Sequence, residues 1–504
     1  MDLIKQCAIW NEKEEYQTII DAIEALPKAQ QTPQLISELA RAYNNRAQVG
    51  DRALFERALE LLQSVEEHFK DEHNWNFRTA YAYYYLDEEG LALRYFEKAL
   101  EARPGDEDTL EFLDDCRRRL AMPRFEKTFR QRTLESWEAF VAGEEELRGL
   151  IDRKNQAAVG EELIKKCEKL LAPAFYDVAF ELGFNGEKYE LILTPEGNRA
   201  KLFELVFFQR RAPKSLLERW NVLVGRQPSQ GFGLRAFGQE IAGRDVQVWV
   251  KPTDSGQVSL AFFCEKLLPM LKEDENKVWW MLSILLDQVL GEIPAMSLIA
   301  QFDVLDAPGD ESGVLMDRLP QTLEAMGLDL AGDPERFLEN GYTAYEMEPE
   351  EDPDADWRLD VYAGVTRCPV LINEYLRGES GTMDEFHRDG AVPGFFLYPL
   401  DCFAMEEERG KAVLDFRDAL EAAVTKAAGE DAVTFLGGAT GIFCGYLDFI
   451  AWDLPRVLAA AADFLEDSPV SWASFHTFRR NVGGIRLKKE DAEKENGEVQ
   501  QAEK

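Results

Sequence analysis

Short runs of hydrophobic residues at helical spacing, separated by turn residues, fill residues 1–120 and predict pairs of helices. The clearest pair lies in NFRTAYAYYYLDEEGLALRYFEKALEARPGD, residues 76–106. Small and bulky residues alternate along this stretch: Ala80, Tyr83, Ala92, Phe96 and Ala99. Small side chains let the two helices approach closely, and the rings fill the space between neighbouring pairs. Pro104 ends the second helix, because proline has no N–H to donate and clashes with the preceding turn.

A second copy of this pattern lies 34 residues upstream. Three positions precede their counterparts by that spacing: Ala58 before Ala92, Leu62 before Phe96, and Val65 before Ala99. Together with Tyr43 on the preceding helix, the pattern resembles the tetratricopeptide repeat, whose period is about 34 residues. YQTIIDAIEALP, closed by Pro27, indicates an earlier second helix. DTLEFLDDCRRRL indicates a capping helix that turns Asp114 and Arg117 to solvent. We predict that this domain covers residues 1–122.

The resemblance implies a concave groove lined by one side of the first helix of each pair. Carried over by position, the candidate partner-binding residues are Arg41, Asn44, Asn45, Phe77, Tyr81, Tyr84 and Tyr85. Aromatic and amide side chains suit an extended or helical peptide. Phe77 and Tyr81 stand where chaperone-tail binders of this family need Lys and Asn, which argues against a chaperone co-factor. Alternatively, the chain's own later helices fill the groove, since exposed aromatic patches are uncommon on monomers.

A basic strip follows the helix pairs. RRRLAMPRFEKTFRQR, residues 117–132, contains seven basic residues and one acidic residue. It is either a docking strip for an acidic partner or a set of charges that pair internally or face solvent. From Thr133 to Leu182 the hydrophobic spacing predicts two or three helices, which connect the domains over residues 123–186.

At Lys188 the pattern changes to that of an α+β module over residues 187–312. The predicted strands are YELILT, NVLVGRQ, VQVWVKP, QVSLAFFCEKL and MSLIAQFDVL. Helices are predicted in PEGNRAKLFELVFFQRRAPKSLLERW and ENKVWWMLSILLDQVLGE, and GFGLRAFGQEIAG is predicted to be a glycine-rich loop. This order predicts one antiparallel-rich, ferredoxin-like sheet with two helices on one face.

Three segments of this module carry a second resemblance: ELILTPEGNRAKLFELV, WNVLVGRQP and LIAQFDVLD. They resemble an uncharacterised bacterial domain family that is related in fold to the inhibitor proteins of ribonuclease E. The resemblance implies a bacterial origin and supplies no catalytic residue. A role in regulating a ribonuclease would rest on fold analogy alone.

A second α+β module is predicted over residues 313–487. Its predicted strands are YTAYEMEP, WRLDVYAGVT, GFFLYPLDCF, two around the glycines of AVTFLGGATGIFCGYLDFIAWD, and VSWASFHTFRR. GKAVLDFRDALEAAVTKAAGE and LPRVLAAAADFLEDS are its helices. The tail, residues 488–504, is charged and without aromatic residues, so we expect disorder. The predicted fold class is multidomain α plus α/β, with helical hairpins followed by two modules with antiparallel-rich sheets.

Composition narrows the possible partners. The chain has 504 residues, with 94 acidic and 57 basic side chains and a formal charge of −37. A surface so negative repels nucleic acid and anionic lipid and attracts basic proteins. The polar start and the lack of a long apolar run argue against a signal peptide or membrane span, so we expect a cytoplasmic protein. Seven scattered cysteines without a CxxC pair predict free thiols and no zinc site.

Candidate chemistry is sparse. The string GGATG, with Gly437, Gly438, Thr440 and Gly441, could cradle an anion, but no Lys follows, and a tight hairpin turn explains it as well. Asp448 and Asp453 are predicted on opposite faces of a strand, with Asp453 capping the next helix. We expect His476 on a strand and His387 in a loop. The acidic residues between 348 and 356 are expected to form a solvated loop without calcium.

These patterns predict a non-catalytic interaction protein that binds a peptide or protein through the helical groove, without cofactor or metal. One alternative is an acidic immunity or inhibitor protein that neutralises a basic toxin or nuclease. The other is an enzyme whose pocket is lined by the GGATG turn.

Overall fold

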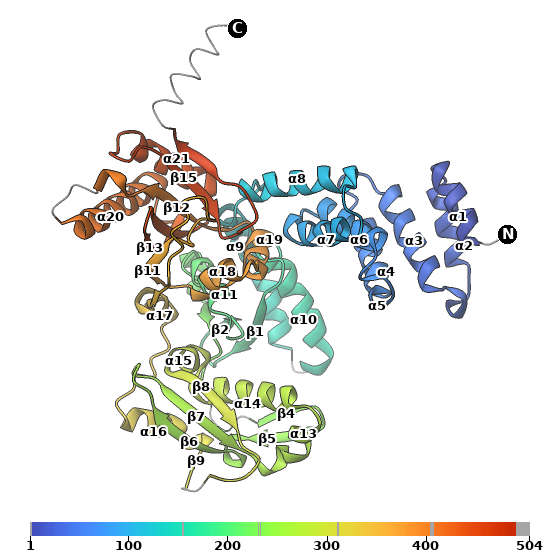
Figure 1. Cartoon of the computed structure of the whole chain (residues 1–504). Helices are drawn as coiled ribbons and strands as arrows, with labels where there is room; N and C mark the ends of the chain where they lie inside the picture. Colours follow the sequence, from blue (N-terminus) through green and yellow to red (C-terminus); the bar gives the residue numbers. More distant parts are fainter. Residues whose placement is uncertain are drawn as a thin grey trace. The chain divides into compact units, whose positions relative to one another are not determined.

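A computed structural model describes residues 3–153, 156–229, 231, 233–309, 312–403 and 408–489 (Figure 1). The chain forms two compact units. Residues 1–130 and 344–504 make the first unit, and residues 131–343 make the second. Described residues from the N-terminal and the C-terminal parts of the sequence therefore belong to one compact unit.

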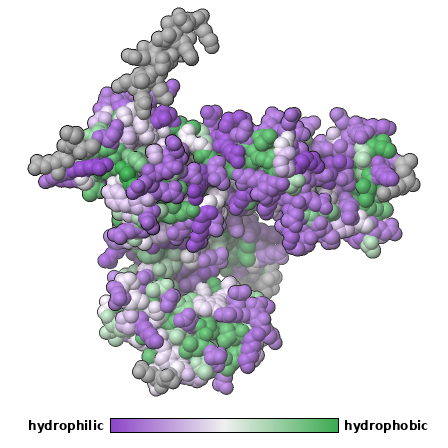
Figure 2. Space-filling view, viewed as in Figure 1, coloured by the Kyte–Doolittle hydropathy of each residue, from purple (hydrophilic) through white to green (hydrophobic). Residues whose placement is uncertain are grey.

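The N-terminal region is a series of stacked helix pairs. Its helices are α1 (Leu3–Glu12), α2 (Tyr16–Glu24), α3 (Pro33–Arg46), α4 (Arg52–Gln63), α5 (Glu66–Phe69), α6 (His73–Tyr85), α7 (Glu89–Ala102) and α8 (Glu107–Ala121). Thr32 and Asp106 begin α3 and α8 by accepting hydrogen bonds from backbone N–H groups in the first turn. Polar residues cover most of the visible face of this stack (Figure 2).

Contacts between residues 34 positions apart confirm that the helix pairs are stacked. Asn44 Nδ2 donates to the carbonyl of Arg78 at 2.9 Å, and Arg52 donates to the carbonyl of Leu86 at 3.2 Å. Alanines at the helix contacts are fully buried: Ala40, Ala58, Ala80, Ala92 and Ala99. Their small side chains allow the close approach that the sequence pattern predicted.

The C-terminal part of the first unit is built on a seven-stranded antiparallel sheet. Its strands are β10 (Thr343–Glu346), β11 (Val361–Thr366), β12 (Val392–Pro399), β13 (Val433–Gly441), β14 (Cys444–Ala451), β15 (Ala473–Thr477) and β16 (Ile485–Lys488). They are arranged in the order β10-β11-β13-β14-β12-β15-β16. Four helices accompany the sheet: α18 (Pro369–Arg377), α19 (Gly381–Asp389), α20 (Arg409–Ala428) and α21 (Leu454–Glu466).

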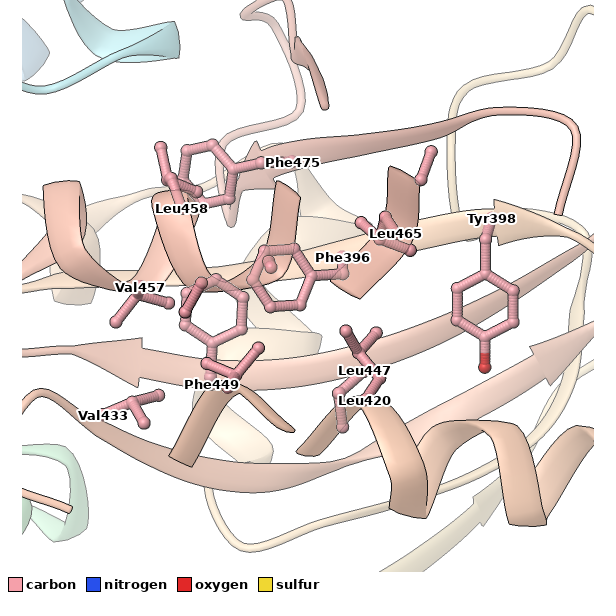
Figure 3. Packing of buried hydrophobic residues seen from close by; sticks show 14 of the residues in the cluster. Phe396, Tyr398, Leu420, Val433, Leu447, Phe449, Val457, Leu458, Leu465 and Phe475 are labelled. Atoms are coloured by element: carbon pink, nitrogen blue, oxygen red, sulfur yellow. The ribbon is translucent and has the colours of Figure 1, made fainter. Parts of the chain in front are cut away.

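Helices α20 and α21 cover one face of this sheet. Leu420 and Val457 point from these helices toward the rings of Phe396, Phe449 and Phe475 on the strands (Figure 3). All five side chains are fully buried. Burial of each contributes about 1.5–3 kcal/mol, which makes this cluster a main source of stability for the unit.

The second unit contains two larger sheets and a hairpin. Its strands are β1 (Ala179–Phe184), β2 (Tyr189–Thr194), β3 (Trp220–Val224), β4 (Gly233–Ala236), β5 (Gln239–Ala242), β6 (Gln247–Pro252), β7 (Val258–Phe263), β8 (Ile299–Val304) and β9 (Val314–Leu315). The sheets are β1-β2-β3 and β8-β7-β6-β9, and β4 pairs only with β5 among the described strands.

Helices cover these sheets. Besides α9 (Phe129–Ile151), which begins in the first unit, they are α10 (Gln156–Leu171), α11 (Arg199–Gln209), α12 (Lys214–Leu217), α13 (Leu268–Glu273), α14 (Glu275–Leu290), α15 (Glu292–Leu298), α16 (Leu319–Ala325) and α17 (Pro334–Asn340). Trp137 of α9 stacks on Phe208 of α11, with ring centroids 4.3 Å apart. Helix α14 forms the centre of the second core through Met281, Leu282 and Leu285.

No single helix among the described residues is long and apolar enough to cross a membrane. Together, α14 and α15 pass that test of length and composition, but they are bent by 106°. The buried face of α14 agrees with the predicted buried helix. Six of the seven cysteines are buried, Cys402 is half-buried, and all seven are free thiols.

Several predicted elements are wrong. Residues 187–312 do not form one sheet, because β2 and β3 pair with β1, which lies inside the segment predicted to be helical. The predicted glycine-rich loop instead forms the β4–β5 hairpin, in which the two strands pair antiparallel. Helices α18 and α19 and strand β16 were not predicted. The predicted disordered tail falls largely outside the described residues, which end at 489.

Candidate interaction site

The four aromatic candidates on α6 form one cluster. Tyr81 lies between Phe77 and Tyr85, with ring centroids 6.3 Å and 4.7 Å away. Tyr85 stacks on Phe55 of α4 at 5.2 Å and meets Tyr84 edge-to-face at the same distance. The four α6 rings are half-buried. Part of each ring therefore reaches solvent while the rest holds the stack together.

Helix α8 supplies the rest of this cluster. Phe112 meets Phe77, Tyr81 and Tyr84 edge-to-face, at 5.9, 5.7 and 5.0 Å. Edge-to-face contacts of this kind contribute about 0.5–1.5 kcal/mol each beyond burial. The chain's own capping helix thus occupies part of the aromatic surface.

Tyr84 is also fixed by charged groups of α8. Its hydroxyl donates to Asp115 at 2.6 Å and accepts from Arg119 at 2.7 Å. Arg119 also lies over the Tyr84 ring, 4.6 Å from its centroid. Burial, and then the hydrogen bond to Asp115, raise the pKa of Tyr84, so the hydroxyl stays protonated.

The polar candidates on α3 lie in a separate group. Arg41 pairs with Glu38, and Glu38 also accepts from Arg78 at 2.9 Å. Arg78 donates further to Ser37 Oγ at 2.7 Å, and burial lowers its pKa. The guanidinium groups of Arg41 and Arg78 therefore share the Glu38 carboxylate.

The two asparagine candidates differ in exposure. Asn44 is 2% exposed and bonds to the backbone of α6, so its side chain joins neighbouring helix pairs. Asn45 is exposed and donates to Asn11 Oδ1 of α1 at 2.9 Å. The structure thus brings the four aromatic candidates together, whereas the three α3 candidates bond to α1, α6 and their own helix.

Two members of this surface were missed in the sequence. Phe112 follows Arg78 by 34 residues, and Arg119 follows Tyr85 by 34. The repeat period could have indicated both. However, Asp114 stands where the repeat has a small residue, so α8 was predicted to be only a capping helix.

A network of ion pairs joins the helix stack to α19, and sequence spacing gave no sign of it. Arg388 donates to Glu88 at 2.8 Å, and His387 lies 3.2 Å from Glu89, which also accepts from Arg119 at 3.2 Å. His387 lies in α19 and not in the predicted loop. These pairs link segments far apart in the sequence, since Glu88 and Arg388 are separated by 300 residues.

Asp384 of α19 lies at the centre of this contact. It pairs with Arg94 of α7 and accepts from Arg479 at 2.7 Å. Gly90 makes this approach possible, because a Cβ there would overlap the Asp384 carboxylate. Arg479 is buried, and that burial lowers its pKa to about 10. A cleft of about 370 Å³ adjoins these groups, between α7, the start of α19 and residues 479–482.

The basic strip is largely paired within the chain. Arg117 pairs with Glu97, Arg118 and Arg119 with Asp115, and Arg130 with Asp431. Internal pairing was one of the two interpretations of the strip.

The other face of the seven-stranded sheet contains a buried polar centre. Arg358 donates to both oxygens of Asp448, at 2.5 and 3.1 Å, and both residues are at most 2% exposed. The guanidinium also lies 4.9, 5.1 and 5.3 Å from the rings of Phe395, Tyr446 and Phe478. We interpret this centre as structural, because every group in it is enclosed.

The glycine string is not a turn. Gly437, Gly438 and Gly441 lie within β13, which pairs with β11 on one side and β14 on the other. A Cβ at Gly437 or Gly438 would overlap the backbone of a neighbouring strand. The glycines therefore allow close strand packing. Thr440 accepts from Arg417 at 3.2 Å.

The remaining candidates have structural explanations. Asp453 stands at the start of α21 without a side-chain capping bond, and it pairs with Arg456 instead. His476 stacks on Phe395, and burial lowers its pKa to about 4. Asp352 and Asp354 are exposed, as expected for a solvated loop, and Asp356 pairs with Arg480. Within the described part of the chain, no group of three or more His, Cys, Asp or Glu residues could hold a metal ion.

Comparison with protein-family models found no match for this chain, and a search of curated proteins found none either. The chain can therefore be described as a region of stacked helix pairs followed by an α/β region, without a family name.

Proposed function

We propose that this protein binds a protein or peptide partner along the side of the helix stack that carries Phe77, Tyr81, Tyr84, Tyr85 and Arg41. The half-buried aromatic cluster supports the proposal most directly, because it combines rigid rings with hydroxyl groups at an accessible surface. The resemblance to tetratricopeptide repeats adds support, since it implies that this side is the concave one.

The charge of the chain supports a basic partner. Its formal charge is −37, and the arginines of the basic strip are largely paired internally. Helix α8, which contributes Phe112 to the aromatic cluster, also exposes the acidic residues Glu111 and Asp114. A partner with lysines or arginines beside an aromatic or aliphatic anchor fits this combination.

The test is binding to a displayed peptide library with the full chain as bait. We expect enrichment of peptides with basic residues around an apolar anchor. Tyr81→Ala and Arg41→Ala should each weaken the selected peptides by about tenfold or more, since truncation of an interface anchor has effects of this size.

Two matched substitutions lie on the second helices of the pairs. Tyr95→Ala on α7 removes another half-buried tyrosine, and Arg57→Ala on α4 removes another arginine that pairs with a glutamate three residues away. Both should leave binding unchanged, with thermal unfolding as the check on folding. Equal losses in the Tyr81 and Tyr95 variants would place the binding surface elsewhere.

An acidic inhibitor of a basic toxin is the second candidate, which the charge of −37 favours. In that case binding to the basic partner should fall steeply with salt and be indifferent to Tyr81→Ala. Pull-down from a bacterial lysate at low and high salt, repeated with the Tyr81 variant, separates the two functions.

A further inference from the structure

Helix α1 has one exposed face at the end of the helix stack. Its inner side packs toward α2 and α3 through Cys7 and the half-buried Leu3 and Trp10. Its outer side carries five exposed residues, which we call the α1 outer stripe: Ile4, Lys5, Ala8, Ile9 and Glu12. Positions three, four and seven apart share a helix face, so these side chains form one continuous stripe.

The α1 outer stripe contains two large hydrophobic residues. Ile4 and Ile9 are 38% and 40% exposed, and both are large hydrophobic residues at a surface where solvent-facing helices are usually polar. Figure 2 shows hydrophobic residues gathered at the end of the stack that carries α1 and α2. At the opposite end of the stack, α8 exposes one large hydrophobic residue, Leu110, beside the acidic Glu111 and Asp114.

The order of charges along the α1 outer stripe is self-complementary. Lys5 lies near the start of α1 and Glu12 at its end, and Ala8 and Ile9 lie between them. The two charges are about 10 Å apart along the helix axis. If two α1 helices pack antiparallel about a twofold axis at Ala8 and Ile9, each Lys5 faces the Glu12 of the other copy. The small Ala8 lets the two helices approach closely at the crossing.

We propose that a second copy of this chain docks on the α1 outer stripe, with α1 against α1 antiparallel, to form a twofold homodimer. A parallel arrangement would instead place Lys5 beside Lys5 and Glu12 beside Glu12, so the charges select the antiparallel pair. A single pair of ten-residue helices buries less than the roughly 1,200 Å² of a stable interface. The dimer is therefore weak and forms reversibly at concentrations between about 10 µM and 1 mM.

Sedimentation equilibrium of the full chain over that concentration range, at about 0.15 M salt, tests this dimer. Long-range repulsion between two acidic chains is largely screened there. Lys5→Glu and Glu12→Lys should each weaken self-association about tenfold or more, because each change creates two like-charge pairs across the twofold axis. The double variant, and an equimolar mixture of the two single variants, should both return to within about threefold of the natural chain.

This design separates local pairing from overall charge. Lys5→Glu makes the chain more negative and Glu12→Lys makes it less negative, so an effect of net charge alone would act in opposite directions. Both substitutions suit α1, since an acidic residue is favourable in the first turn of a helix and a basic residue in the last turn. Loss of self-association would therefore not reflect loss of the helix.

A hydrophobic substitution completes the test. Ile9→Asp should abolish the dimer, whereas Ile164→Asp, on α10 with 49% exposure, should leave it unchanged. A chain that stays monomeric at about 1 mM, or self-association that the single charge reversals do not change, would overturn the proposal. Failure of the double variant to recover would overturn it too, because residues 5 and 12 would then not pair across a twofold axis.

Discussion

Two arginines inside the fold, Arg358 in the first unit and Arg226 in the second, differ in their surroundings, and their side chains are 2% and 11% exposed. Arg358 meets one carboxylate, Asp448, through two hydrogen bonds, and three aromatic rings enclose its guanidinium. Arg226 is 11% exposed and faces four carboxylates: Glu181 at 3.1 Å, Glu196 at 3.6 Å, and Asp287 and Glu292 at 3.8 Å.

The carboxylates around Arg226 are not equally stabilised. Glu292 is fully buried but accepts from the backbone N–H groups of Gly197 and Arg226, at 3.1 and 3.0 Å. The charge partner of Asp287 is the Arg226 guanidinium, 3.8 Å away. Burial and the charge of Glu292 raise the pKa of Asp287 to about 7, although Arg226 opposes the shift.

The two sites differ in the number of carboxylates that meet one cation. At Arg358 one carboxylate accepts two hydrogen bonds from one guanidinium. At Arg226, Asp287 and Glu292 share one guanidinium, and two neighbouring negative charges in a buried site disfavour each other. We therefore expect the Arg226 site to respond to pH through Asp287.

The largest expected effect is at the enclosed pair. Asp448→Asn leaves the Arg358 cation buried without its counter-charge, so the free energy of unfolding of the first unit should fall by about 3–5 kcal/mol. Urea unfolding, with hydrogen exchange of peptides from β13 and β14, measures the loss in this unit. Asp431→Asn, which removes the partner of Arg130 at a carboxylate that is 42% exposed, should change stability by less than about 1 kcal/mol.

A double substitution sharpens this result. Arg358→Met with Asp448→Leu removes both charges and should be less destabilising than Asp448→Asn alone, because no unpaired charge stays buried. A double variant that lost more stability than the single variant would contradict this expectation. The attraction between Arg358 and Asp448 would then itself stabilise the fold.

The second effect is a pH dependence in the second unit. In the unfolded chain the pKa of an aspartate is about 3.9, whereas that of Asp287 in the folded chain is about 7. Between these values the folded state holds a proton that the unfolded state does not. The contribution of Asp287 to the free energy of unfolding is therefore complete below about pH 4 and is lost as the pH rises through 7.

Asp287→Asn should remove this slope, because the amide does not titrate. At pH 8 the variant should be more stable than the natural chain, by up to about 3 kcal/mol, and the advantage should vanish near pH 4. Hydrogen exchange of α14 peptides at both pH values measures it. Asp303→Asn at an exposed position on β8 serves as the comparison, and an equal effect there would assign the slope to general charge repulsion.

The sequence allowed prediction of features that depend on local spacing. Ala58 and Ala92, or Leu62 and Phe96, lie one period apart, so the stacked helix pairs follow from repetition alone. The strands β6 and β7 were predictable because each alternates and a short turn joins them. The clustering of Phe77, Tyr81, Tyr84 and Tyr85 follows from their positions on one helix.

Features that depend on distant pairing were not predictable. Asp448 was identified as a strand residue, but its partner Arg358 lies 90 positions earlier. Arg358 was placed in the predicted strand WRLDVYAGVT, whereas it lies in a turn before β11, which begins at Val361. Strand β1 was assigned to a helical segment, because short apolar runs fit either structure until a partner strand is known. The contact of α19 with α7 depends on Gly90, and a single glycine in a helix gives no indication of what approaches it.

The smallest expected effect concerns Asp384. It differs from both sites because its single carboxylate pairs with two arginines, Arg94 and Arg479. Gly90→Ala places a methyl group where the Asp384 carboxylate lies, so the carboxylate must move away from both cations. The free energy of unfolding of the first unit should fall by about 1–3 kcal/mol, as for other overpacked sites. Faster hydrogen exchange in α19, without a matching change in α3, would locate the effect at this contact.

Gly149→Ala on α9 is the matched helical substitution, since a Cβ there meets nothing within 4 Å. It should stabilise its helix by about 0.5–1 kcal/mol, because alanine loses less backbone entropy than glycine. A stabilising Gly90→Ala would mean that Asp384 can shift and still keep both arginines. The site would then resemble the loosely held carboxylates around Arg226 more than the enclosed pair at Arg358.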